Sequence, residues 1–245
     1  MQELDFELDG AWASNKGITL CRPVSFSAAV PRTQAITIPG RNGALHIDEG
    51  AFNVRTASVS CYALSAANVV SSMGEIMAFL FGNGFGIQDY RKLTSSDDTG
   101  YFWYARIVNA GEIAARLGKL NPFTIEWECK PFRYVVGSDT QETVASKTFT
   151  NPTQFPSYPL IYVNSSGGGT ISVTSGAQTT GTITISSGSP GGFYIDCEEM
   201  RAYSGNTSYD QYITCDEFPW MPLGQSHFEI TGGLAVTAAP RWRTL

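Results

Sequence analysis

The amino-acid sequence predicts a mainly β protein of two domains with one principal α-helix. Most apolar residues alternate with polar ones at a period of two, which is typical of strands with one buried face. A helical period occurs in one segment, and the pattern changes near residue 136 from mixed α and β to almost entirely β. A chain of 245 residues is long enough for two hydrophobic cores. We therefore expect an amino-terminal α+β sandwich-like domain over 1–136, a polar linker over 137–148 and a β-sandwich over 149–245.

Composition and charge narrow the functional classes. Hydrophobic residues make up 42% of the chain and charged residues 16%, which favours a folded protein over a disordered one. The formal net charge of -6 argues against a nucleic-acid binder that tracks phosphates. The longest wholly apolar run, Ile76–Phe81, is too short to span a bilayer, and the acidic start of the chain does not resemble a cleavable signal peptide. We expect synthesis in the cytoplasm, without a membrane anchor.

The five cysteines predict free thiols rather than a disulfide framework or a zinc site. They are odd in number, widely spaced and without a C-x-x-C pair. Cys129 and Cys197 fall on the apparent inward faces of strands, where a thiol packs as a small hydrophobic group.

The central strand of the first domain is predicted at Thr124–Tyr134. Its apolar residues alternate with Glu and Lys until Pro131, where a missing N–H and a fixed φ should bend or end the strand pairing. Asn42-Gly43 predicts a tight hairpin turn, because both residues tolerate positive φ. Further strands of this domain are indicated at Leu4–Leu8, Ile18–Val24, Ala35–Ile38, Val54–Leu64 and Tyr101–Val108.

One segment has the periodicity of a helix. From Asn68 to Phe81, apolar residues recur at steps of three and four, and we expect this stripe to pack on the first sheet; its members are Val69, Met73, Ile76, Met77 and Leu80. Ser65 or Asn68 can cap the start of the helix, and Gly82 can end it. The glycine-rich stretch 82–86 follows this helix instead of preceding one, so it does not favour a phosphate-binding loop.

The sequence predicts that the second domain is a β-sandwich of short strands separated by Gly/Ser/Thr turns. Two similar segments, Thr170–Thr174 and Thr182–Ser186, resemble the arms of one hairpin. The other predicted strands are Pro159–Val163, Phe193–Cys197, Gln211–Cys215, Ser226–Thr231 and Leu234–Ala238.

Few residues point to chemistry. The two histidines, His46 and His227, fall in different domains, and the sequence has neither a G-x-S-x-G elbow nor an H-E-x-x-H motif. We predict no catalytic residues, no metal and no cofactor. A glycoside hydrolase would have to use carboxylates such as Asp196, Glu198 and Glu217. Asp196 and Glu198, however, lie on the polar face of an alternating strand, where solvated charge is expected.

A carbohydrate-binding module is the alternative from another class. Such a module would bind sugar on the sandwich, with Trp220 and Tyr203 as contacts, together with nearby Tyr209 and Tyr212. Trp220 must lie in a loop, because prolines flank it in Pro219-Trp220-Met221-Pro222. A glycan array or titration would show whether the protein binds sugars, although this hypothesis leaves the first domain unexplained.

A series of features, in order along the chain, resembles the distal tail proteins of long-tailed phages. In the first domain these are Ile38-Pro39-Gly40-Arg41-Asn42-Gly43-Ala44-Leu45, the single helix, and Ile125 to Tyr134 with its Cys-Lys-Pro-Phe ending. The second domain continues the match with Pro159-Leu160-Ile161, Tyr194–Glu198, Phe218-Pro219, Leu223-Gly224 and the closing Pro240-Arg241-Trp242-Arg243.

The resemblance implies a structural component of the virion tail tip. The first domain would form a hexameric ring that joins the tail tube protein to the baseplate hub or tail-associated lysin, and the second would be galectin-like. Head-to-tail contacts in such a ring are heterologous and close after a fixed rotation. We expect the segment at Pro39, Gly40, Arg41, Asn42, Gly43 and Leu45, and the loop Gly82–Arg91, to contribute to the ring interface.

Overall fold

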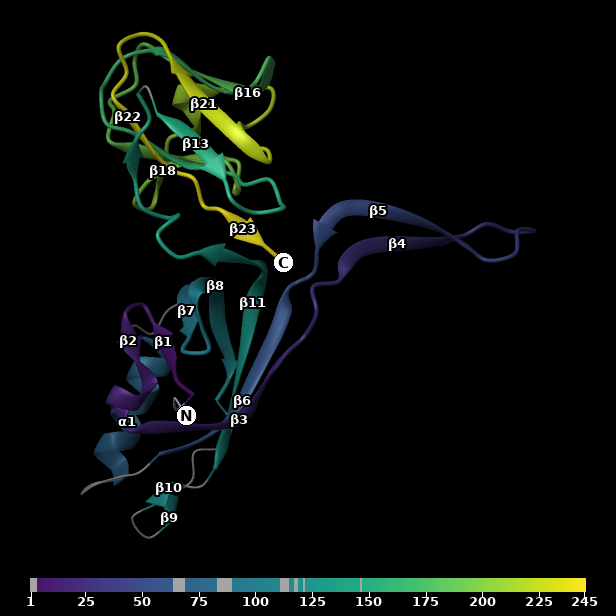
Figure 1. Ribbon diagram of the computed structural model, residues 1–245, viewed down its shortest axis with the longest axis vertical. Coiled ribbons are helices and arrows are strands. Elements are labelled where there is room, and N and C mark those ends of the chain that lie inside the picture. Colours follow the sequence, from purple (N-terminus) through teal and green to yellow (C-terminus); the bar gives the residue numbers. More distant parts are fainter. Residues whose placement is uncertain are drawn as a thin grey trace. The chain divides into compact units, whose positions relative to one another are not determined.

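The computed structural model describes residues 4–63, 69–82, 90–110, 115–116, 119–120, 122–145 and 147–245. The chain divides into two compact units, Met1–Arg133 with Leu245 and Tyr134–Thr244 (Figure 1). Strands dominate both, and α1 (Val69–Phe81) is the one α-helix within the described ranges. The predicted mainly β fold with one principal helix is therefore confirmed.

The first unit is built on a curled antiparallel sheet with the strand order β2-β1-β7-β8-β11-β6-β3. Its strands are β1 (Phe6–Leu8), β2 (Ala11–Trp12), β3 (Ile18–Phe26), β6 (Arg55–Ala63), β7 (Arg91–Ser95), β8 (Asp98–Asn109) and β11 (Phe123–Val135), with a short 3-10 helix at Ala13–Lys16. Two further pairs lie outside this sheet, namely β4 (Pro31–Thr37) with β5 (Ala44–Phe52), and β9 (Ala115–Arg116) with β10 (Lys119–Leu120).

Strand β11 is the long central strand that the sequence predicts. It pairs with β6 from Phe123 opposite Cys61 to Cys129 opposite Arg55, and this pairing ends before Pro131, as expected. Ile125, Trp127 and Cys129 are buried in the core. Beyond Pro131 the strand continues to Val135, whose N–H donates to the carbonyl of Trp242.

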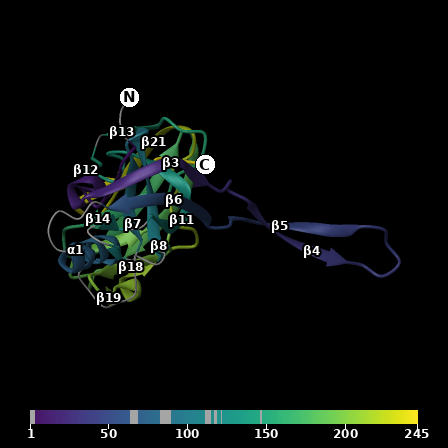
Figure 2. The same cartoon turned by 90° about the horizontal axis from the view of Figure 1, so that it is seen from below.

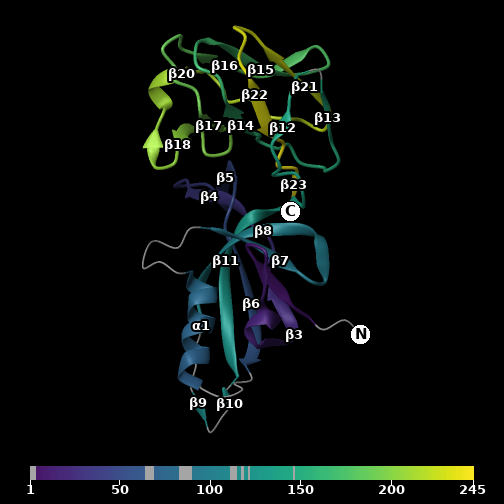
Figure 3. The same cartoon turned by 90° about the vertical axis from the view of Figure 1, so that its left-hand side faces the viewer.

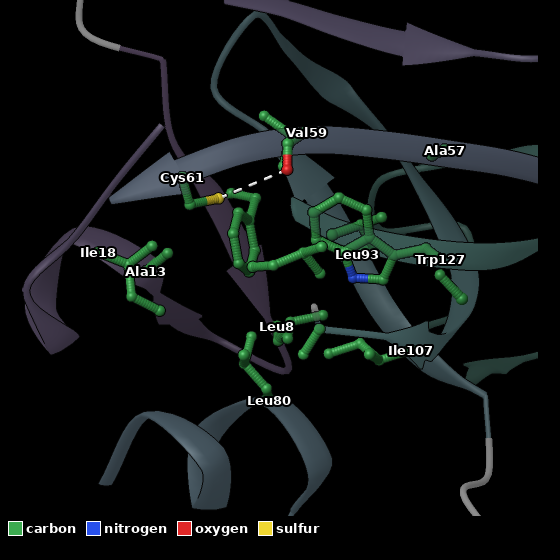
Figure 4. Close-up of a cluster of buried hydrophobic side chains, with 14 of the residues drawn as sticks. Leu8, Ala13, Ile18, Ala57, Val59, Cys61, Leu80, Leu93, Ile107 and Trp127 are labelled. Carbon is green, nitrogen blue, oxygen red and sulfur yellow. Dashed lines mark hydrogen bonds between the residues drawn. The ribbon is translucent and has the colours of Figure 1, made fainter. Parts of the chain in front are cut away.

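Helix α1 covers one side of this core (Figure 3). Ile76, Phe79 and Leu80 lie at steps of three and four and pack into the cluster formed by the sheet. Figure 4 shows Leu80 facing Leu8 of β1. Met77, predicted within the apolar stripe, is instead 39% exposed. The predicted cap at Ser65 or Asn68 and most of the glycine-rich stretch 82–86 lie outside the described residues.

The second unit is a sandwich of two antiparallel sheets, as the resemblance to a galectin-like domain implies. The six-stranded sheet has the order β12-β22-β14-β17-β18-β19, and the five-stranded sheet has the order β13-β21-β15-β16-β20. The strands of these two sheets are β12 (Glu142–Thr143), β13 (Thr148–Asn151), β14 (Leu160–Val163), β15 (Gly169–Ser175), β16 (Gln178–Ile185), β17 (Phe193–Asp196), β18 (Arg201–Ser204), β19 (Thr207–Ser208), β20 (Ile213–Thr214), β21 (Gly224–Ile230) and β22 (Val236–Ala239). The last strand, β23 (Arg243–Thr244), belongs to neither sheet and pairs with β11.

Alternation along the strands builds the core between these two sheets. Ile161, Val163 and Ile195 come from the six-stranded sheet, and Ile171 and Ile183 from the five-stranded one. The predicted hairpin is present as β15 and β16, with Ile171 opposite Ile183. Cys197 is also buried here, as its place in the alternation indicates.

Residues 137–148 belong to this second unit instead of forming a separate polar linker. Strand β12 within this segment pairs with β22, and the Val144 side chain is completely buried in the sandwich core. The segment lacks a sequence period because only a two-residue strand and one apolar anchor hold it.

Candidate interaction surfaces

Strands β4 and β5 form a long hairpin, which we call the arm, that stands apart from the other elements of the first unit (Figure 2). Every residue of β4 and residues 44–50 of β5 are exposed. A two-stranded hairpin without a packed face is at best marginally stable in water. The arm therefore has no core of its own in the single chain.

The two faces of the arm differ sharply in chemistry. The register places Ile36 opposite Leu45 and Gln34 opposite Ile47, so these four side chains share one face. Ile36, Leu45 and Ile47 are 37–43% exposed, and Ile38 just beyond the strand is similar. The other face carries Thr33, Ala35, Thr37, Ala44, His46 and Asp48. An amphipathic ribbon with an uncovered apolar face is typical of a surface that packs against another protein.

The tip of the arm contains the predicted interface residues. The Arg41 N–H donates to the Ile38 carbonyl at 3.1 Å, and Gly40 has φ of 80°. Pro39 and Gly40 thus occupy the central positions of a type II turn. The hairpin prediction is correct, but this turn replaces the tight Asn42-Gly43 turn that we expected, and Gly43 supplies a second positive φ of 82°.

The root of the arm is tied to the sheet of the first unit. Arg55 Nε donates to the Ser27 carbonyl at 2.8 Å, and the Thr56 N–H donates to Ser27 Oγ at 2.8 Å. Phe52 packs edge-on against Phe132 of β11, with 5.6 Å between ring centroids. The arm therefore leaves the sheet from a fixed base.

The carboxylate of Asp196 is buried in an ion pair, which corrects the expectation of a solvated charge. Its side chain is 7% exposed, and both oxygens accept hydrogen bonds from Arg241, at 2.6 and 2.9 Å. Burial alone would raise the pKa of Asp196, but Arg241 and the N–H groups of Glu198 and Glu199 outweigh it and hold the pKa below its ordinary value.

The neighbouring Glu198 is likewise engaged within the protein. Its carboxylate accepts from the Tyr134 hydroxyl at 2.9 and 3.0 Å and from Arg243 at 3.0 Å. Burial beside this carboxylate raises the pKa of Tyr134 well above its ordinary value. Asp196 and Glu198 thus fasten the carboxy-terminal segment to the end of β17, and both carboxylates are engaged in these contacts instead of being left for a substrate, as a pair of glycosidase carboxylates would be.

The two proposed sugar-contact residues are held by different sheets. Trp220 is half-buried in the loop before β21, and its carbonyl accepts from Thr180 of β16 at 2.6 Å. Tyr203 lies on β18 of the six-stranded sheet. Tyr209 packs on Phe193 and on Tyr212. The structure does not assemble these side chains into one platform.

Other residues with potential chemistry are dispersed. His46 is exposed on the arm, whereas exposed His227 lies 3.4 Å from Thr148 Oγ1 on β13. Across the described ranges, no three His, Cys, Asp or Glu side chains gather as metal ligands. Within the same ranges, no helix has the length and hydrophobicity needed to cross a bilayer.

Comparison with known proteins identifies a shared fold. The chain aligns over its full length with all of the crystal structure of the SPP1 Dit (gp 19.1) protein, at a TM-score of 0.65 and 16% sequence identity. That protein is described as a paradigm of the hub adsorption apparatus in phages that infect Gram-positive bacteria. No protein-family model and no curated protein sequence matches the chain.

Proposed function

We propose that this protein is a structural component of a phage tail tip, where it forms a closed ring through its first unit. Two independent lines support the proposal. The sequence motifs resemble distal tail proteins, and the whole chain has the fold of one such protein, SPP1 Dit. The resemblance implies six subunits in the ring, a tail tube protein on one side, and a baseplate hub or tail-associated lysin on the other.

The arm is the observation that carries the ring proposal. Its apolar face leaves Ile36, Leu45 and Ile47 in solvent. A partner that covers this face would stabilise the complex by about 25 cal/mol for each Å² of apolar surface that it buries. Packing this face on a second copy recovers that free energy and supplies the core that the hairpin lacks. The predicted interface residues Pro39–Leu45 lie at the far end of the same arm, where they reach a neighbour first.

An arm that contacts a different surface of the next copy makes a heterologous interface. Such contacts repeat with a fixed rotation and close into a ring, whereas two arms that pack face to face would produce a twofold dimer. Ring subunits act through contact area and shape. We accordingly propose a scaffolding role without catalysis, in which the buried carboxylates Asp196 and Glu198 stabilise the second unit.

The experiment is to measure the mass of the purified protein by light scattering for two matched variants. Ile36→Asp with Ile47→Asp places two charges on the apolar face, and Ala35→Asp with Thr37→Asp places the same two charges on the polar face. We expect the wild type and the polar-face variant to assemble and the apolar-face variant to remain a single chain. Equal masses for both variants would contradict the role of this face, and a two-chain mass for the wild type would contradict the ring.

A further inference from the structure

A single row of hydroxyl-bearing side chains crosses the six-stranded sheet of the second unit. The strand register aligns one residue from every strand, in the order Thr143, Thr237, Tyr162, Tyr194, Tyr203 and Ser208. Residues that precede or follow them, such as Val163, Val236 and Ile195, are buried in the core. Because side chains alternate between faces, the row lies on the outward face of the sheet. We call these six residues the hydroxyl row.

The three tyrosines at the centre form a continuous aromatic strip. The ring centroids of Tyr162 and Tyr194 are 4.8 Å apart with an interplanar angle of 43°, and those of Tyr194 and Tyr203 are 5.9 Å apart at 28°. The guanidinium of Arg201 lies over the Tyr203 ring, 4.7 Å from its centroid. Stacking of this kind stabilises neighbouring strands, but it uses ring faces and leaves the phenol hydroxyls available.

The polar groups of this strip are not used inside the protein. Among the residues that the structure describes, neither the hydroxyls of the three tyrosines nor the guanidinium of Arg201 has a hydrogen-bond or ion-pair partner. In the same unit, Arg241 and Arg243 are both paired with carboxylates. Two members of the hydroxyl row are engaged within the protein, since Thr237 Oγ1 donates to Gln141 Oε1 at 2.9 Å and Ser208 Oγ donates to Asp210 Oδ2 at 2.8 Å. Among the described residues, the outward face of the sheet therefore presents half-buried aromatic rings, three phenol hydroxyls without a hydrogen-bond partner, and the Arg201 guanidinium.

We propose that the hydroxyl row binds an extended acidic polysaccharide chain that lies across the strands. Neighbouring strands are about 4.8 Å apart, so Tyr162, Tyr194 and Tyr203 recur across the three central strands at intervals close to the length of one sugar ring. The tyrosine hydroxyl suits the polar edge of a sugar, because it both donates and accepts hydrogen bonds. The planar fork of Arg201 suits a carboxylate or phosphate on the chain.

The test uses an array of linear oligosaccharides of increasing length, with neutral chito-oligosaccharides and carboxylated oligogalacturonates as probes for the full-length protein. We expect retention of the carboxylated series, stronger with each added unit until the row is filled. Tyr162→Ala with Tyr194→Ala should weaken binding by at least about tenfold, and Arg201→Gln should abolish the preference for carboxylated over neutral chains. Tyr62→Ala, at an exposed position of the first unit, should bind as the wild type does.

Two results would overturn the proposal: no carboxylated chain retained by the folded wild type, or equal retention by the wild type and the double variant. Melting curves check that each variant is folded. If the double variant does not fold, Tyr194→Phe replaces it, because phenylalanine keeps the ring stack and removes one hydroxyl; unchanged binding by Tyr194→Phe and Arg201→Gln together would then reject the site. Ring assembly is measured separately and does not depend on this outcome.

Discussion

Arg241 illustrates how single residues hold the second unit together. Its backbone has φ of 50°, which is rare for a residue other than glycine and costs free energy. The guanidinium offsets that cost through two hydrogen bonds to Asp196 and one to the Tyr158 carbonyl at 2.9 Å. Since the pair is buried, removing one partner would leave an uncompensated charge and cost about 3–5 kcal/mol. The last residues of the chain are thus part of the fold.

The buried carboxylate predicts a dependence of stability on pH. The folded pKa of Asp196 lies below its unfolded value of about 4, so its stabilising contribution is complete above that pH and is lost as the pH falls through the folded pKa. Thermal melts between pH 7 and pH 3 should show this loss in the wild type. Asp196→Asn should melt at a lower temperature at pH 7, and the difference from the wild type should shrink below about pH 4. A constant difference would contradict the ion-pair account.

The burial of the cysteines predicts which thiols react with a reagent in the folded protein. Cys61, Cys129 and Cys197 are buried, and burial raises the pKa of Cys61 and Cys129 to about 12. Cys21 and Cys215 are half-buried, and all five thiols are unpaired. A thiol reagent at pH 8 should label Cys21 and Cys215 in the folded protein and the other three only after unfolding. Rapid labelling of all five in the native state would show that the cores are not packed as described.

At the scale of elements, the sequence predicts the strands and the helix that have a strong hydrophobic period, but it does not predict which residues pair over long distances. The central strand and the helix were recognisable because each buries one face against a core. Strand β5 is not predicted, since only Leu45 and Ile47 alternate with polar residues before Glu49-Gly50, and its apolar face has no partner among the residues that the structure describes. Asp196 gave no sign of burial because its partner, Arg241, lies 45 residues further along the sequence.

The exposure of the arm predicts that a substitution at its tip will change assembly with little effect on the stability of the single chain. Because its residues 31–50 are exposed, Arg41→Glu at the tip should change the free energy of unfolding of the single chain by less than about 0.5 kcal/mol. The same substitution should weaken assembly, since the tip would carry the opposite charge into the interface. Denaturant unfolding and light scattering measure the two quantities. Unchanged assembly would remove the tip from the proposed interface.

At the scale of the whole molecule, two separate hydrophobic cores predict two unfolding steps. No residue is shared between the core clusters of the two units within the described chain. Ile125→Ala should lower the melting temperature of one calorimetric transition, and Ile171→Ala should lower that of the other. Loss of a buried isoleucine side chain to alanine costs about 2–5 kcal/mol, enough to resolve the shifts. A single transition that moves with both variants would show that the units unfold together.

Electron microscopy of the assembled wild-type protein tests the ring most directly. We predict closed particles with sixfold symmetry and a mass six times that of the 26.5 kDa chain, with each arm lying on the neighbouring subunit. Particles with twofold symmetry, or arms that remain free in solvent within an assembled particle, would contradict this account.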